Sequence, residues 1–133
     1  MLTIYETMLR GVVKATVDAV DPERIILFGP YAQGEVGADA HLDLLVVERG
    51  PLEQQRRRRM EIHRIRRALE GFHVAVDVSV FTPEEMMAWR GCGDHVIARA
   101  LREGRILYQR PAAQEVEDFG SIAPQAPQPL CST

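Results

Sequence analysis

The residues best suited to chemistry are two carboxylates and an imidazole on two predicted strands. His41 and Asp43 stand two apart in the apolar segment 41–47, so both side chains project from one face of a strand. Asp77 lies in the middle of segment 72–81, where apolar and other residues alternate. Oxygen ligands suit hard cations such as Mg²⁺, and such ions neutralise phosphates during phosphoryl or nucleotidyl transfer. The pattern indicates a divalent-metal and phosphate site.

A glycine turn precedes these residues and supplies the phosphate side of such a site. Segment 24–28 is a short apolar run closed by Gly29-Pro30, which predicts a buried strand, a turn and the start of one helical turn. A helix N-terminus presents N–H groups to an anion, and Gly29 allows a phosphate to approach closely. The cation ligands and the turn are therefore expected side by side.

Helices and strands that could hold this site are predicted along most of the chain. Apolar side chains recur at helical spacing in 3–20, 52–70 and 94–103, and Thr82-Pro83-Glu84-Glu85 is a strong helix start with a capping box. Strands are predicted at 24–28, 41–47, 72–81 and 105–108. We therefore predict one α/β (α+β) domain, with a mixed sheet of three to five strands flanked by helices on one side.

Charge and composition divide the chain into a body and a tail. The chain has 133 residues and a net charge of −3, with 16 basic and 19 acidic residues. All the bases and 16 of the acids lie in residues 1–110, the predicted domain. Residues 111–133 are rich in Pro, Ala and Gln without periodicity, and we predict a disordered tail. No apolar run approaches the ~20 residues of a membrane span and no signal peptide is recognisable, so we expect a cytoplasmic protein without a membrane partner.

These segments together resemble a known family. The sequence is similar to minimal nucleotidyltransferases of the DNA polymerase beta superfamily, whose motif is Gly-Ser, ten residues, Asp-x-Asp, and a third Asp on a later strand. Here the motif reads Gly29-Pro30, ten residues, His41-Leu42-Asp43, with Asp77 as the third carboxylate. Flanking residues also match, and the resemblance covers about residues 3 to 108. It implies a polymerase-beta-like nucleotidyltransferase fold and transfer of AMP from Mg-ATP, or another nucleoside triphosphate, to an acceptor hydroxyl.

The resemblance also implies a role for each motif residue. Gly29 and Pro30 would lie at the nucleotide, while His41, Asp43 and Asp77 would occupy the metal-ligand positions, with Asp77 also the candidate catalytic base. Pro30 replaces a Ser and has neither a hydroxyl nor an N–H for the phosphates. His41 replaces an Asp, and a neutral imidazole cannot bridge two Mg²⁺ ions as a carboxylate does. We expect both changes to impair catalysis.

Several interpretations of the site stay open at this point. One is a single weak Mg²⁺ site on Asp43 and Asp77, and another is a site for Mn²⁺ or Zn²⁺ that uses His41. A third is that the three are simply polar residues facing an open groove. Whether the protein is an enzyme is correspondingly uncertain, and the alternative function is that of a catalytically inactive, antitoxin-like partner of a small helical HEPN-type protein.

The other conspicuous motif is the run Arg56-Arg57-Arg58-Arg59, followed by Arg64, Arg66 and Arg67. This run could form a positively charged surface that binds RNA or a triphosphate, or it could be the solvated face of a helix. We favour the solvated helix face. Without interleaved aromatic residues, and with a charge-balanced body, nucleic acid is an unlikely partner. The sequence leaves a homo-oligomer open. Cys92 and Cys131 form no metal or disulfide pattern, and we predict free thiols.

Overall fold

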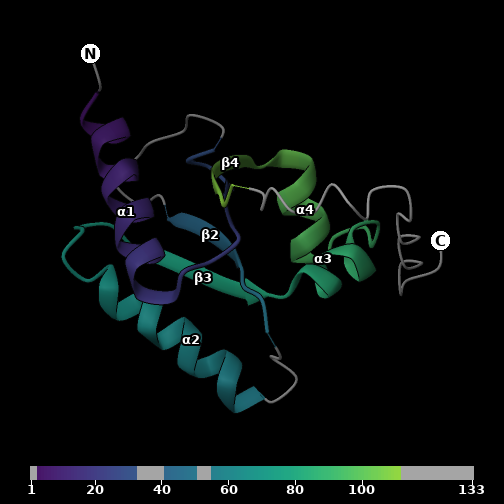
Figure 1. The fold of residues 1–133 in the computed structure, drawn as a ribbon. Helices are drawn as coiled ribbons and strands as arrows, with labels where there is room; N and C mark the ends of the chain where they lie inside the picture. Colours follow the sequence, from purple (N-terminus) through teal and green to yellow (C-terminus); the bar gives the residue numbers. More distant parts are fainter. Residues whose placement is uncertain (1–2, 33–40, 51–54, 112–133) are drawn as a thin grey trace.

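The structure, a computed structural model, describes residues 3–32, 41–50 and 55–111 (Figure 1). The described part of the chain forms helices and strands in the order α1 (Ile4–Val20), β1 (Arg24–Phe28), β2 (Leu42–Val47), α2 (Gln55–Ala68), β3 (Val76–Phe81), α3 (Pro83–Trp89), α4 (Val96–Glu103) and β4 (Arg105–Gln109). Each of the predicted helices and strands is present with small shifts of its ends. The α+β class is confirmed.

The strands form one mixed sheet in the order β3-β2-β1-β4. β1 is antiparallel to both β2 and β4, whereas β2 and β3 run parallel. A parallel pair needs a crossover, and α2 provides it between β2 and β3. The sheet therefore brings the beginnings of β2 and β3 to the same end, where β1 finishes.

Helices cover both faces of this sheet, and the prediction that they flank it on one side is wrong (Figure 1). α1 and α2 pack on the face that carries Leu42, Leu44 and Val46, and α3 and α4 pack on the face of Leu45 and Val47. Successive apolar residues of a strand point to opposite faces, so a continuous run such as that of β2 needs cover on both sides.

The helix ends follow the capping signals of the sequence. The Thr3 hydroxyl accepts the Glu6 N–H at the start of α1. At the start of α3, Thr82 and Glu85 form the predicted capping box. His95 caps α4, because its Nδ1 accepts the Ile97 N–H at 3.1 Å. Such caps satisfy N–H groups that lack a partner within the helix.

Two details differ from the expectations. β3 begins at Val76, because the Phe72 N–H donates to Leu69 and the Val74 N–H donates to Phe72, so this stretch forms turns and not strand. The helical spacing of apolar residues in 94–103 also predicts an inward position for Leu101, but its side chain in α4 is 42% exposed. The turn hydrogen bonds at Phe72 and Val74 thus shorten β3 at its start. In α4 the buried residues are Ile97, Ala98 and Ala100, so the inward face of this helix does not include Leu101.

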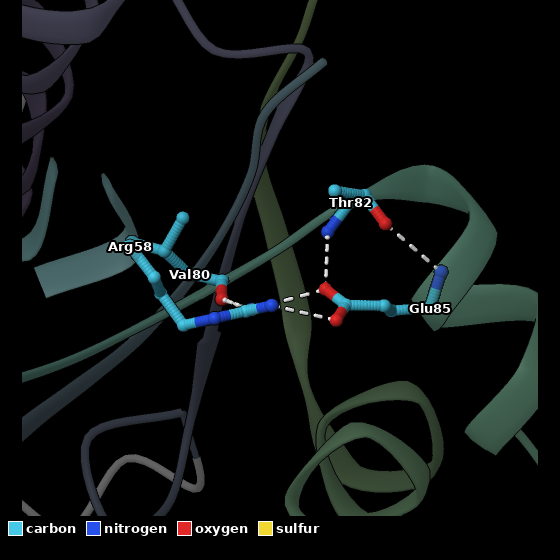
Figure 2. Close-up of polar contacts among 4 residues, drawn as sticks. All are labelled: Arg58, Val80, Thr82 and Glu85. Atoms are coloured by element: carbon cyan, nitrogen blue, oxygen red, sulfur yellow. Dashed lines mark hydrogen bonds and ion pairs between the residues drawn. The ribbon is translucent and has the colours of Figure 1, made fainter. Parts of the chain in front are cut away.

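One arginine of the basic run ties α2 to α3 (Figure 2). The Arg58 guanidinium donates to both carboxylate oxygens of Glu85, at 3.0 and 2.6 Å, and to the Val80 carbonyl at 2.6 Å. Burial acts to raise the pKa of Glu85, but its hydrogen bonds with Arg58 and Thr82 hold that pKa below the ordinary range. Arg58 is thus a structural residue, unlike the solvated side chains expected of the whole run.

Some expectations concern residues outside the described ranges. These are the loop residues 33–40 and all of the predicted tail beyond residue 111. Cys92 is disulfide-bonded, so the prediction of a free thiol is wrong for this residue, and Cys131 lies outside the described residues. None of the helices within the described ranges is both long and apolar enough to cross a bilayer.

Candidate active site

The turn after β1 requires a glycine for two independent reasons. Gly29 has φ 77°, in the left-handed region that residues with a Cβ avoid. A Cβ at this position would also collide with Oδ2 of Asp43, whose carboxylate lies directly over the glycine. The Ala32 N–H donates to the Gly29 carbonyl at 3.1 Å and closes the turn. The predicted phosphate turn therefore lies in contact with a predicted metal ligand.

The register of the sheet brings the two predicted carboxylates together. Phe28 pairs with Asp43 across β1 and β2, and Asp43 pairs with Asp77 across β2 and β3. Both carboxylates lie on the face covered by α4, at the start of their strands. The His41 Nδ1 lies 3.6 Å from an Asp77 carboxylate oxygen, and both side chains are more than half exposed. All the predicted site residues within the described ranges are thus neighbours at one end of the sheet.

The charge of this cluster is only partly balanced. Burial raises the pKa of Asp43, and the Asp77 carboxylate raises it further through its charge and a hydrogen bond. His41 and Arg99 act in the opposite direction, with Arg99 reaching toward the site from α4. A proton or a cation between the two carboxylates would relieve their repulsion. The Asp43–Asp77 pair therefore fits a single hard cation by the chemistry of its oxygen atoms.

The three predicted ligands do not form a complete metal centre. Within residues 3–32, 41–50 and 55–111, no group of three or more His, Cys, Asp or Glu side chains is arranged to hold a metal ion. His41 lies beside the Asp43–Asp77 pair, with its Nδ1 within ion-pair distance of the Asp77 carboxylate. Cation binding by the two carboxylates stays a prediction.

The turn that carries Pro30 is anchored to α1 through a pair of tyrosines. The ring of Tyr31 is buried and stacks on Tyr5, with 5.6 Å between centroids and 14° between planes. The Tyr5 hydroxyl donates to the Tyr31 carbonyl at 2.8 Å. Pro30 begins this rigid turn without an N–H to offer an anion. The turn is therefore well fixed, but it has two hydrogen-bond donors fewer than a turn built with serine, whose N–H and hydroxyl Pro30 lacks.

Arg66, Glu70 and Arg99 lie near the site and were not among the predicted site residues. A shallow pocket of about 360 Å³ adjoins His41 and Asp77, and Arg66 and Glu70 at the end of α2 line it. The turns between α2 and β3 bring Arg66 and Glu70 close to the site, and the packing of α4 against the sheet brings Arg99 close to it. No local pattern in the sequence indicates either arrangement.

Comparison with known proteins gives a family and a set of similar folds. Residues 9–107 match the family model of the nucleotidyltransferase domain. A structure described as a toxin–antitoxin with AMP-PNP is similar with a TM-score of 0.56 and 18% identity, over 85% of this chain and 81% of that one. A structure described as a putative nucleotidyltransferase from Sulfolobus solfataricus is similar with a TM-score of 0.54 and 18% identity, over 80% of this chain and 84% of that one.

A third similar structure is that of a tri-AMPylated Shewanella oneidensis HEPN toxin in complex with MNT antitoxin. It has a TM-score of 0.52 and 14% identity, over 87% of this chain and 79% of that one. No protein of curated function matches the sequence. At these identities the solved structures establish a shared fold, and the family model extends across most of the helices and strands described above.

Proposed function

The chain belongs to the nucleotidyltransferase domain family, and we propose that its 1–110 domain is a nucleotidyltransferase in which transfer of AMP to an acceptor hydroxyl is impaired. The donor would be Mg-ATP or another nucleoside triphosphate. The observation that carries the proposal is the pairing of Asp43 with Asp77 across β2 and β3, directly beside the Gly29 turn. That arrangement keeps two oxygen ligands beside a turn that a phosphate could approach.

Each residue at the site has a distinct proposed role. Asp43 and Asp77 would hold one Mg²⁺ or Mn²⁺ ion, which when bound neutralises phosphate charge. Asp77 is the more accessible of the two carboxylates and would accept the proton of the acceptor hydroxyl. Gly29 would let the triphosphate approach the backbone, and Arg99 would add a positive charge near Asp43.

The impairment follows from two side chains of the same cluster. His41 brings no carboxylate oxygens, so the cluster contains two carboxylates instead of three. Pro30 offers neither an N–H nor a hydroxyl to the phosphates. Both substitutions act on metal–triphosphate binding, and neither disturbs the sheet, because Pro30 occupies a turn and the His41 side chain is more than half exposed.

A second candidate is an antitoxin-like protein that acts in the cytoplasm by binding a small helical HEPN-type partner. Two of the similar structures support it, since they are described as a toxin–antitoxin and as a HEPN toxin in complex with MNT antitoxin. The site supports it as well, because Pro30 and His41 weaken catalysis while leaving the fold intact. In this candidate the nucleotide site would be a remnant.

A single incubation distinguishes the two candidates. The full chain is mixed with α-labelled ATP, Mg²⁺ or Mn²⁺, and the HEPN-type protein encoded by the adjacent gene. Slow label transfer that disappears in Asp43→Asn, and persists in the exposed control Asp18→Asn, supports the enzyme. A stable complex without transfer supports the binding protein. Transfer as fast in Asp43→Asn as in the wild type contradicts the proposed site, and neither complex nor transfer contradicts both candidates.

A further inference from the structure

The outward face of α2 carries more positive charge than the surrounding residues balance. Helix α2 contains seven arginines and a single glutamate. Arg58 is paired with Glu85, and Arg64 lies 3.3 Å from Glu61. The other five arginines form no ion pair with a described residue. At about 100° per residue, Arg56, Met60, His63 and Arg67 point directly away from the sheet.

We call this surface the arginine face and define it by the exposed residues Arg56, Arg59, Met60, His63, Arg64 and Arg67. Like charges three and four residues apart on a helix destabilise it by a few tenths of a kcal/mol each. The only glutamate of α2, Glu61, is 7% exposed and turned toward the core, and of the arginines of this face it pairs with Arg64 alone. An acidic surface placed against the arginine face would offset this repulsion.

The arginine face also has an apolar centre. Met60 is 55% exposed, although it lies on a helix whose inward residues are well buried. Arg56, Arg59, Met60, His63 and Arg64 line a shallow hollow of about 300 Å³. The methylene stems of arginine are apolar, and methionine adapts its shape to an incoming side chain. This hollow is suited to one apolar side chain surrounded by carboxylates.

The composition of the face favours a protein over a nucleic acid. Single-stranded nucleic acid is bound by stacking of bases on aromatic rings combined with positive charge. The arginine face, as defined above, contains no Phe, Tyr or Trp. Arginine and methionine are both enriched in protein–protein interfaces relative to the rest of the surface.

We infer that the arginine face binds an acidic protein surface bearing one apolar side chain, which enters the hollow at Met60. This inference rests on the partner-binding part of the proposed function, because it gives that partner a location on this chain. The location is separate from the carboxylate cluster, since the arginine face points away from the sheet and Asp43 lies on the sheet's opposite face, under α4.

The test compares two double charge reversals in the full chain. Arg56→Glu/Arg67→Glu changes the arginine face, and the control Arg102→Glu/Arg105→Glu makes the same change of charge at exposed residues of α4 and β4, which pair with Glu103 and Glu6. Affinity for the HEPN-type protein of the adjacent gene is measured by titration calorimetry at two salt concentrations. We expect the face variant to bind roughly 30-fold more weakly with a reduced salt dependence, and the control to stay within about twofold.

The other outcomes separate this inference from the proposed function. The inference is overturned if the wild type and the face variant bind the partner equally well, or if the control variant loses as much affinity as the face variant. In either case the proposal of a HEPN-type partner is still supported. Tighter binding to an RNA of about 20 nucleotides, lost in the face variant, overturns it in favour of nucleic acid. If Glu115→Gln/Glu117→Gln/Asp118→Asn strengthens partner binding tenfold, the chain's own acidic segment is the occupant and the inference is also overturned.

If the wild type forms no complex with that protein, the partner proposal fails and the arginine face is tested by itself. The probe is a fluorescent peptide of alternating Glu and Leu residues, measured by anisotropy with the wild type and both variants. Loss of binding only in Arg56→Glu/Arg67→Glu supports the inference, and equal binding by all three proteins contradicts it. Circular dichroism of each variant verifies that α2 remains folded.

Discussion

A buried pair of glutamates makes the stability of this protein depend on pH in an unusual direction. Glu48 follows β2 and is 6% exposed, and Glu61 of α2 is 7% exposed beside it. Burial, together with the hydrogen bond and the charge of Glu61, raises the pKa of Glu48 to about 8 from an ordinary value of 4.5. Arg64 and Arg57 act in the opposite direction without cancelling the increase. Near neutral pH the folded protein therefore keeps a proton on Glu48 that the unfolded chain releases.

The sign of the effect follows from this difference in proton binding. Below pH 4.5 Glu48 is protonated in both states, and its full contribution to stability is present. As pH rises toward 8, the unfolded chain is stabilised by ionisation while the folded protein is not. At 1.36 kcal/mol for each unit of pKa difference, the loss between pH 5 and pH 8 is about 3 kcal/mol. Glu48→Gln keeps a hydrogen-bond donor for Glu61 and removes the titration.

The assay is urea unfolding of the wild type and Glu48→Gln at pH 5 and pH 8. We expect the stability advantage of the variant to increase by about 3 kcal/mol between the two conditions. Glu70→Gln, an exposed change at the end of the same helix, controls for the loss of one acidic group and should show no such increase. Parallel pH profiles for the wild type and Glu48→Gln would refute the shared proton between Glu48 and Glu61.

Two further substitutions test the contacts that hold α2 and the glycine turn. Arg58→Ala should lower the free energy of unfolding by about 2 kcal/mol, because it leaves the partly buried Glu85 carboxylate without its ion-pair partner. Arg59→Ala should change it by less than about 0.5 kcal/mol, and equal losses would contradict the structural role. Gly29→Ala should lower the free energy of unfolding by about 3 kcal/mol, because it adds a collision with Asp43 to the backbone strain. The control Gly50→Ala should lower it by only about 1 kcal/mol, because Gly50 also has a positive φ but its Cβ would enter open space. Urea unfolding measures both, and similar costs at the two glycines would exclude the collision.

Local signals in the sequence were sufficient for most of the fold. The apolar stripe of α1, the capping box at Thr82 and the alternation in β3 each depend on residues close in the chain. The helices on both faces were missed, although the unbroken apolar run of β2 was visible. The start of β3 was misplaced because turn hydrogen bonds at Phe72 and Val74 compete with the sheet.

The residues of the candidate site that belong to a sequence motif were predictable, whereas those brought to the site by the packing of distant segments were not. The spacing between Gly29 and Asp43, the alternation around Asp77 and the resemblance to the family motif identified these residues as a group, and the sheet register brings them together. Arg99 acts on Asp43 from α4, which is far away in sequence. The role of Arg58 was equally hidden, because four consecutive arginines look alike until the position of Glu85 is known.

The central proposal is that Pro30 and His41 weaken a nucleotide site that the fold still provides. It is tested most directly by titration calorimetry of Mg-ATP into the wild type and into the double variant Pro30→Ser/His41→Asp. We predict weak or undetectable binding by the wild type, and binding at least about tenfold tighter by the double variant, abolished again by adding Asp43→Asn. Equal affinity of the wild type and the double variant would contradict the proposal.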